Sequence, residues 1–527
     1  MTFPLIHPLT QKSWDKIGQK HHHGVNIPLG AIRTHQSSGI GEFLDLLPLI
    51  DWCHRLRFDV IQLLPLNESG PSEPSPYNAL SSCALHPIYL SLHALPLTEN
   101  LSALPPLQRH LTALNTTKHL AYREVLALKN SYLIHYLSAV KEELKKKESY
   151  ITFVKEEEWL LDYALFKALK NSYRERHWQE WPEKARHPSH TRKKQWLKTY
   201  SEEIEFHCLI QYLCFSQLQQ AKAYAEEKKV WLKGDIPILV NSDSADVWAH
   251  RAFFHLDQIV GRPSSALEPE GQYWGFPLYN WKAMEENHFE WWKKRLQTAA
   301  KLYHIYRIDH IIGFFSLWTI PAGQHPKTGR YIPSDPNLME AQGRHLLATL
   351  LSFTDMLPIG EDLGDPDPCI QKVLTEYGIP GTKIFRWQRN WDKDHSFIPY
   401  EDYPPISMSS VSTHDLATVA LWWRTFPKEA AAYAAFKKWR QTPQLSQDHH
   451  LEILWDNHHS GSLFHINLLQ EYLALAPHVT WEDPQDERIN YPGTVQPQNW
   501  TYRYKMPLEL LMEDSPLNQA FERILAP

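Results

Sequence analysis

Residues 303–315 read YHIYRIDHIIGFF, an apolar, strand-like run that carries a carboxylate at Asp309. Two other segments have the same form and end in a carboxylate, namely LPIGE at residues 357–361 and ISMSSVSTHD at residues 406–415. The three carboxylates, Asp309, Glu361 and Asp415, are 52 and 54 residues apart along the chain. One βα unit takes about 30 residues, so each interval holds one to two units. Because the ends of barrel strands converge on one pocket, we expect the three carboxylates to meet.

Strand-like runs recur along the rest of the chain, at residues 25–29, 59–66, 231–240, 303–315, 357–360, 382–387 and 406–411. Helical patterns such as residues 42–56 and 204–229 lie between them. Strands that alternate with helices favour a parallel sheet covered by helices. The pattern therefore predicts an α/β fold, a (β/α)8 TIM-type barrel with long loops, such as residues 67–77, at its C-terminal face.

The alternation of strand-like and helical patterns stops between residues 97 and 203, where strand-like runs are absent. Amphipathic helical patterns take their place, for example at residues 122–144 and 159–171. We interpret residues 97–203 as a helical insertion subdomain inside one catalytic barrel domain that spans residues 1–527. Barrels with insertions reach comparable sizes, so the length of 527 residues is compatible with a single barrel.

Composition argues against several classes of partner. The net charge is −6 and Lys and Arg are scattered, whereas a nucleic-acid binder shows a clustered basic face. Uninterrupted apolar runs of about 18 residues are absent, so we expect no membrane span. The N-terminus lacks the pattern of a signal peptide. The five cysteines form no CxxC pair, which is typical of a reduced, cytoplasmic protein.

Sequence signatures of other chemistries are also missing. There is no HExxH motif and no paired Cys/His spacing, so the sequence predicts neither a metal site nor a cofactor. The 30 histidines are dispersed, and the short run at residues 21–23 indicates nothing by itself. Gly39-Ile40-Gly41 lacks the third glycine of a dinucleotide fingerprint, and neither a P-loop nor a GxSxG elbow occurs.

Paired carboxylates are the minimum equipment for cleaving a glycosidic bond. Arg307 would favour the ionised form of Asp309 that a nucleophile needs, and an apolar strand end would raise the pKa of Glu361 as a general acid requires. Each residue alone has a structural alternative: an ion pair for Arg307, or a helix N-cap for Glu361 and Asp415. Three strand-end carboxylates together favour a sugar-active enzyme. Asp243 and Asp246 follow another strand-like run and are candidates for the same rim.

Longer motifs strengthen this interpretation. They are SPYNALSSCALHPIYLSL (75–92), WLLDYALFKALK (159–170), GDIPILVNSDSADVWAH (234–250), GQYWGFPLYNW (271–281), YRIDHIIGFFSLW (306–318) and RINYPGT (488–494). Through them the chain resembles the 4-alpha-glucanotransferase family, also called amylomaltases or disproportionating enzymes. It differs from the family's usual pattern at residues 262–265 and at Phe276, which puts acceptor preference in doubt.

The resemblance implies a retaining mechanism without a cofactor, acting on maltooligosaccharides and on glucans derived from starch or glycogen. It implies that Asp309 is the nucleophile, Glu361 the acid/base and Asp415 the third carboxylate. The implied substrate contacts are Ser75, Tyr77, Asp243, Trp274, Arg307, His414 and Asn490. Two alternatives stay open: an alpha-amylase-type hydrolase on the same barrel, and a catalytically silent glucan-binding protein. The sequence predicts no oligomeric state.

Overall fold

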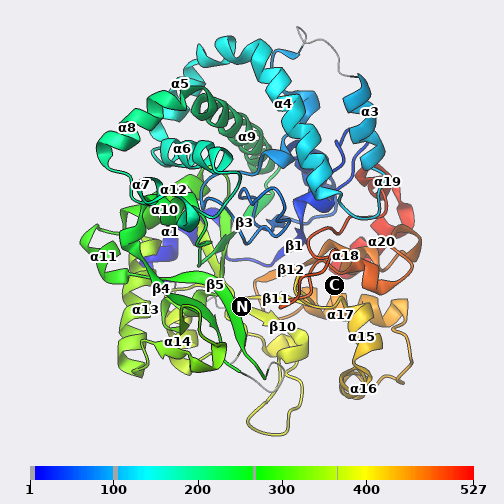
Figure 1. Cartoon of the computed structure of the whole chain (residues 1–527). Helices are drawn as coiled ribbons and strands as arrows, with labels where there is room; N and C mark the ends of the chain where they lie inside the picture. The colour runs from blue at the N-terminus through cyan, green and yellow to red at the C-terminus, as the bar shows by residue number, and fades with distance from the viewer. Residues whose placement is uncertain (1–5, 99–104, 265–268, 365, 527) are drawn as a thin grey trace.

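The computed structural model describes residues 6–98, 105–264, 269–364 and 366–526. At its centre, eight parallel strands form a closed barrel (Figure 1). In chain order they are β1 (His22–Ile27), β2 (Val60–Leu63), β3 (Trp231–Pro237), β6 (Ile305–Asp309), β9 (Leu357–Gly360), β10 (Gly381–Ile384), β11 (Ser407–Ser410) and β12 (Phe464–Leu468). Each strand pairs with the next, and β12 pairs with β1 to close the barrel. This arrangement confirms the predicted (β/α)8 fold.

Seven of the eight barrel strands overlap the strand-like runs of the sequence, and β12 is the one that the sequence analysis missed. The run at residues 303–315 is longer than β6 because His310 adopts a left-handed backbone conformation, with φ of 56°, and ends the strand. The chain then forms the turn Ile311–Phe314. Asp309 is therefore the last residue of its strand, at the C-terminal face of the barrel.

Helices cover the outside of the barrel. They are α1 (Pro8–Ile17), α2 (Leu46–Arg55), α10 (Ala245–Ala249), α11 (Trp281–Glu286), α12 (Glu290–Ala300), α13 (Pro336–Leu351), α14 (Pro368–Glu376), α15 (Val419–Thr425), α16 (Pro427–Phe436), α17 (Gln447–His458), α18 (Leu469–Leu473), α19 (Leu508–Glu513) and α20 (Ser515–Leu525). None of the described helices combines the length and hydrophobicity that crossing a membrane requires.

The connection between β2 and β3 consists largely of helices, which gather at the top of Figure 1. They are α3 (Pro105–Leu114), α4 (Tyr122–Lys145), α5 (Glu148–Glu156), α6 (Trp159–Ser172), α7 (Glu183–Arg186), α8 (His190–Thr199) and α9 (Ser201–Glu227). A buried ion pair of 2.5 Å between Lys129 of α4 and Glu42 ties this layer to a barrel loop. Of the expected insertion at residues 97–203, residues 99–104 lie outside the described part of the chain.

A second, antiparallel sheet stands beside the barrel, in the strand order β5-β4-β7-β8. Its strands are β4 (Phe254–Arg262), β5 (Gln272–Tyr279), β7 (Leu317–Pro321) and β8 (Arg330–Ile332). The sequence analysis did not predict this sheet. Its strand β5 carries Trp274, whose ring meets that of His310, just after β6, edge-on at 5.1 Å between centroids.

The N-terminal end of the barrel is closed by apolar side chains. Trp14 of α1 packs against Phe464 of β12, and its indole donates a hydrogen bond of 2.9 Å to the carbonyl of Gly378. The same cluster includes Val60, Ile305 and Leu357, all fully buried at the starts of their strands. A sealed floor leaves the opposite, C-terminal end as the place for a site.

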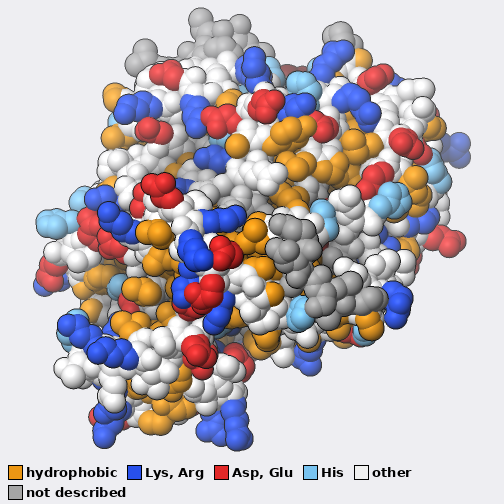
Figure 2. Space-filling model, turned by 90° about the horizontal axis from the view of Figure 1, so that it is seen from above, with side chains coloured by type: hydrophobic (Ala, Val, Ile, Leu, Met, Phe, Trp, Pro, Cys, Tyr) orange, Lys and Arg blue, Asp and Glu red, His pale blue; other side chains and the backbone are white. Residues whose placement is uncertain are grey.

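Charged side chains of both signs are interspersed on the face of the molecule seen from above (Figure 2). Lys and Arg side chains lie next to Asp and Glu on this face, with hydrophobic groups between them. Because opposite charges alternate, this face does not offer the continuous basic surface that a nucleic-acid backbone requires.

Candidate active site

Arg307 is the centre of a charged network at the C-terminal face of the barrel. Its guanidinium lies 2.7 Å from Asp309 Oδ1, and its other terminal nitrogen donates to both oxygens of Asp235, at 2.8 and 2.9 Å. β6 places Arg307 and Asp309 on the same side because residues two apart on a strand share a face. Asp235 comes from the neighbouring strand β3, directly opposite Arg307 in the parallel register.

Asp309 and Glu361 are close neighbours. Nη2 of Arg307 lies 2.7 Å from Asp309 Oδ1 and 3.9 Å from Glu361 Oε2. The separation of the two carboxylate oxygens therefore cannot exceed the sum of these two distances. The predicted meeting of strand-end carboxylates is thus present in the structure for this pair.

Glu361 lies directly after β9, and its side chain is largely buried. Its Oε2 accepts a hydrogen bond of 2.9 Å from the His310 backbone, and its Oε1 accepts one of 3.1 Å from the Leu363 backbone. Burial raises the pKa of Glu361 to about 7, with Arg307 and the two N–H groups opposing the rise and Asp309 adding to it. A carboxyl group with this pKa holds a proton near neutral pH.

The carboxyl group of Asp415 has a lowered pKa, in contrast to that of Glu361. Burial by itself would raise its pKa, but His414, Asn490 and Arg307 outweigh burial and lower the pKa to about 2. The amide of Asn490 donates to Asp415 Oδ1 at 2.6 Å, and His414 Nε2 lies 3.3 Å from Asp415 Oδ2. Asp415 is therefore ionised near neutral pH, whereas the surroundings of Glu361 favour its protonated form.

Tyr77 connects the two halves of the network. Its hydroxyl donates to Asp235 Oδ2 at 2.8 Å and lies 3.1 Å from His414 Nε2, while its ring stacks on the His414 ring at 5.5 Å. Asp235 is a site residue that the sequence analysis missed. Asp235 lies inside the strand-like run 231–240. A carboxylate in the middle of a buried strand is unusual, but the sequence alone does not show the partners that would identify it as a site residue.

The structure does not bring Asp243 and Asp246 into this network. Asp243 is 5% exposed, and its carboxylate is taken up by Lys170 Nζ at 2.7 Å and by the Trp178 backbone N–H at 3.0 Å. Asp246 accepts hydrogen bonds from the Ser82 side chain and backbone. Both carboxylates hold loops together instead of facing the Arg307 network, so a substrate contact for Asp243 stays a prediction.

The helix-cap alternatives for Glu361 and Asp415 are wrong. The helix after Glu361 is α14, and its N-cap is Asp367, whose side chain accepts from Cys369. The helix after Asp415 is α15, and its N-cap is Thr418. Neither strand-end carboxylate is needed to start a helix.

Ser75 and the stretch 262–265 are two further features singled out by the sequence analysis. Ser75 is buried two residues before Tyr77, on the loop that follows β2. Of the divergent stretch 262–265, Ser265 lies outside the described residues. A direct role for Ser75 in substrate contact stays a prediction.

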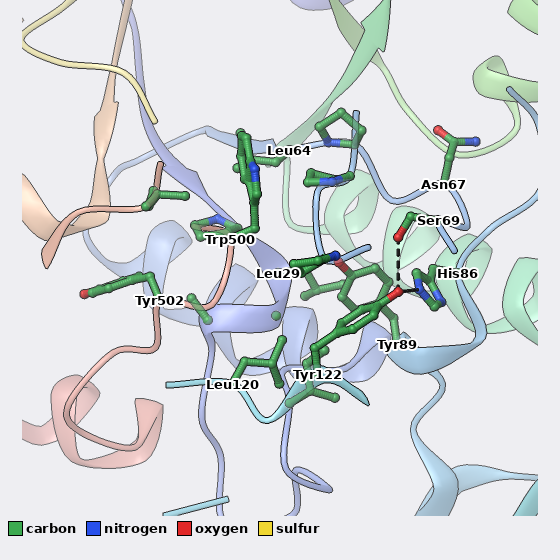
Figure 3. Close-up of a pocket in the computed structure, with 18 residues that line it drawn as sticks. Leu29, Leu64, Asn67, Ser69, His86, Tyr89, Leu120, Tyr122, Trp500 and Tyr502 are labelled. Carbon is green, nitrogen blue, oxygen red and sulfur yellow. Dashed lines mark hydrogen bonds between the residues drawn. The ribbon is translucent and has the colours of Figure 1, made fainter. Parts of the chain in front are cut away.

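An aromatic side chain borders the network on its far side. Trp500 packs against Tyr77 and His414, with centroid distances of 5.5 and 5.7 Å, and it also lines a neighbouring pocket. Figure 3 shows this pocket, in which the Tyr122 hydroxyl points toward Ser69 and His86. Trp500 thus lies between the charged network and this pocket, which is lined by aromatic and proline side chains.

Comparison with known proteins supports one family. A family model described as 4-alpha-glucanotransferase matches residues 27–509. The chain belongs to the 4-alpha-glucanotransferase family. It is 40% identical to the 4-alpha-glucanotransferase of Chlamydia pneumoniae over 98% of both chains, and 32% identical to that of Thermus thermophilus over 86% of this chain and 88% of the relative.

A solved relative has the same fold. The amylomaltase of Streptococcus agalactiae, in complex with acarbose, superposes with a TM-score of 0.82 at 26% identity, covering 96% of this chain and 98% of that one. Membership in the 4-alpha-glucanotransferase family makes the chain an enzyme of glucan metabolism. Family membership also favours glucan transfer over the two alternatives that the sequence left open, an alpha-amylase-type hydrolase and a catalytically silent glucan-binding protein.

Proposed function

We propose that the enzyme transfers alpha-1,4-glucan segments by a retaining double displacement in which Asp309 is the nucleophile and Glu361 the acid/base. The observation that carries the proposal is the single guanidinium nitrogen of Arg307 within 2.7 and 3.9 Å of the two carboxylates. Retaining pairs lie about 5–5.5 Å apart and inverting pairs about 6.5–9.5 Å apart. The sum of the two distances to Arg307 reaches only the lower edge of the inverting range, which supports retention.

In the first step, protonated Glu361 gives its proton to the glycosidic oxygen while an oxygen of Asp309 attacks the anomeric carbon. The leaving glucan departs with a free 4-hydroxyl, and an ester joins the donor sugar to Asp309. In the second step, the 4-hydroxyl of an acceptor glucan attacks the same carbon, ionised Glu361 takes the hydroxyl proton, and the bond to Asp309 breaks. Asp415, His414, Asn490 and Tyr77 are placed to hold the donor sugar through these steps.

Transfer requires that a sugar hydroxyl reaches the ester before water does. Trp274 and Phe276 on β5 are partly buried and stand next to the loop after β6. Apolar rings at this position favour a stacked sugar and disfavour loosely held water. We therefore assign the acceptor side of the site to β5, with the sugar face packed on Trp274.

Residues 97–203 serve, in this proposal, as a helical wall of the substrate groove within one catalytic unit. The support is the set of ion pairs between the helical layer and the loops of the barrel: Lys129 binds Glu42, and Lys170 binds Asp243 on the loop after β3. Maltooligosaccharides and glucans from starch or glycogen are the proposed substrates. Free thiols at all five cysteines support action in the cytoplasm.

The decisive experiment is incubation of the purified protein with maltotriose, with the products separated by chain length. A ladder of longer and shorter maltooligosaccharides plus glucose is the expected result. Glucose and maltose as the only products would mean that water, and not a sugar hydroxyl, attacks the ester. That result would contradict the transfer proposal. Retention is tested by NMR of the anomeric proton in each newly formed glycosidic bond, where beta-1,4 linkages would contradict it.

Asp309→Asn tests the nucleophile. The amide cannot form the ester, so we expect kcat to fall by at least about 10³-fold with an unchanged circular dichroism spectrum. Asp257→Asn, an exposed carboxylate on β4, is the matched control and should retain full activity. Turnover near the wild-type level in the Asp309 variant would refute the assignment.

A further inference from the structure

Three histidines that are far apart in sequence meet at the N-terminal end of the barrel. His23 lies on β1, His465 lies opposite it in the register of β12, and His458 ends α17. One ring nitrogen from each lies within 4.8 Å of the others. The cluster lies on the seam where the first and last strands close the barrel, at the end opposite to Asp309 and Glu361.

The contacts of His458 leave a free lone pair inside the cluster. The Tyr472 hydroxyl donates to the carbonyl of Gly24 at 3.0 Å and accepts from the Asn467 amide at 3.0 Å. His458 Nε2 lies 2.8 Å from the same hydroxyl, and with the hydroxyl hydrogen assigned to Gly24 we assign the donor role to Nε2. The Asn467 amide, 3.3 Å from Nε2, has its two hydrogens directed to Asn457 and Tyr472.

This tautomer resembles the arrangement found behind metal-binding histidines. A ligating imidazole donates its other N–H to a fixed acceptor, which sets the tautomer and orients the ring. Because Nε2 carries the proton, Nδ1 of His458 presents its lone pair toward His23 Nδ1, only 2.9 Å away. Two facing ring nitrogens at this distance share either a proton or a cation.

His465 supplies a second unusual nitrogen. The residue is fully buried, its Nε2 lies 3.3 Å from the Ser460 hydroxyl, and its Nδ1 is buried with no hydrogen-bond partner among the described residues. An unpaired buried nitrogen costs free energy, which a bound cation would recover.

We propose that His23, His458 and His465 bind a divalent transition-metal ion of the zinc class. Imidazole nitrogen is a preferred ligand of Zn²⁺, at about 2.0–2.1 Å, so tetrahedral ligands are about 3.4 Å apart. The observed separations, from 2.9 Å to at most 4.8 Å, bracket this value and need only small ring rotations. Three protein ligands leave the fourth position to water.

The site is structural in its effect. The ligands come from β1, β12 and α17, the helix that precedes β12. A bound ion would therefore stabilise the pairing of β1 with β12 that closes the barrel. The sequence predicted no metal site, because residues 23 and 458 are 435 positions apart and no local spacing reveals them. Only the closure of the barrel brings the ligands together.

Full-length protein freed of metal with a chelator should be titrated with Zn²⁺ by calorimetry, and with Co²⁺ under visible absorption. Wild type is expected to bind one equivalent more tightly than its remaining surface sites, to show the intense visible bands of tetrahedral Co²⁺, and to gain about 2 °C or more in Tm with Zn²⁺. Absence of both the bands and the Tm gain in wild type would overturn the proposal.

Variants locate the ion. His23→Gln, on the half-buried edge, and His458→Gln should each weaken that equivalent at least tenfold and abolish the Tm gain. His345→Gln removes an exposed histidine paired with Glu285 on the molecular surface and is the matched control. Circular dichroism and cooperative unfolding confirm that each variant is folded. Equal Zn²⁺ affinity in wild type and a folded His23→Gln variant would also overturn the proposal.

Discussion

At the scale of single residues, the raised pKa of Glu361 links activity to pH. In the proposed mechanism Glu361 must be protonated to cleave the glycosidic bond, and burial raises its pKa to about 7. We therefore expect kcat/KM for maltotriose to fall above about pH 7, with one proton lost. Initial rates measured as a function of pH test this decrease in kcat/KM. A flat profile between pH 5 and 9 would contradict the role of Glu361 as general acid.

The same carboxyl group affects stability. Its pKa is raised in the folded protein above the ordinary value of 4.5, so the folded state binds the proton more tightly than the unfolded state. This contribution is present below about pH 4.5 and is lost as the pH rises through about 7. Glu361→Gln, which mimics the protonated form, should therefore stabilise the protein by about 1–3 kcal/mol at pH 8.5 and by little at pH 5. Thermal melts at both pH values test this, and a pH-independent difference would contradict it.

Asp235 is a positioning residue, since it acts through Arg307 and Tyr77. Asp235→Asn removes the fully buried counter-charge of the Arg307 guanidinium and leaves it only the partly exposed Asp309 and Glu361, so we expect a loss of about 3 kcal/mol in the free energy of unfolding. kcat should drop at least tenfold while KM changes little, because the distortion falls on the Asp309–Glu361 pair. Tyr77→Phe removes a hydroxyl that bonds Asp235, His414 and Arg307 but removes no charge, and it should cost about 1 kcal/mol. Equal effects in both variants would argue against the buried charge as the cause.

At the scale of elements, α13 packs closely against Phe315, which follows the turn after β6. A Cβ added at Gly343 of α13 would lie 2.2 Å from the Phe315 ring. Alanine favours a helix over glycine by about 1 kcal/mol, but overpacking a buried ring costs about 1–3 kcal/mol. We expect Gly343→Ala to lower both Tm and kcat.

A second substitution separates packing from other causes. Phe315→Leu removes the ring edge that the new methyl group would strike. The double variant Gly343→Ala/Phe315→Leu should therefore be more stable than the sum of the two single effects, and denaturant unfolding of all four proteins measures this coupling. Simple additivity would show that the two residues do not compete for space.

The elements also show what the sequence reveals and what it conceals. Seven barrel strands stand out as strand-like runs because strands of a parallel barrel are buried on both faces. Strand β12 alternates instead: His465 and Asn467 face residues of α17, and their polar character hides the strand. Asp309 and Glu361 were predictable because both end or follow such runs directly. Asp235 was not, because its partners come from 72 and 158 residues away.

At the scale of the whole molecule, the helical layer depends on buried charge. Lys129 Nζ binds Glu42 at 2.5 Å and the carbonyls of Ile88 and Leu90 at 2.7 and 2.8 Å. Lys129→Met would leave the buried Glu42 without its cation, at a cost of about 3–5 kcal/mol. Chemical denaturation measures this loss, and adding Glu42→Gln should recover part of it. No recovery in the double variant would place the cost in packing.

The closure of the barrel between β1 and β12 also has a consequence for synthesis. A ribosome has to release the chain as far as Leu468 before β12 is complete, and until then β1 and β11 are both open sheet edges. Open edges with apolar faces pair with other chains, and domains emerge N-terminus first at about 5–20 residues per second. The nascent enzyme therefore carries Asp309, Glu361 and Asp415 on an open sheet for several seconds, and in this interval protection by a chaperone matters most.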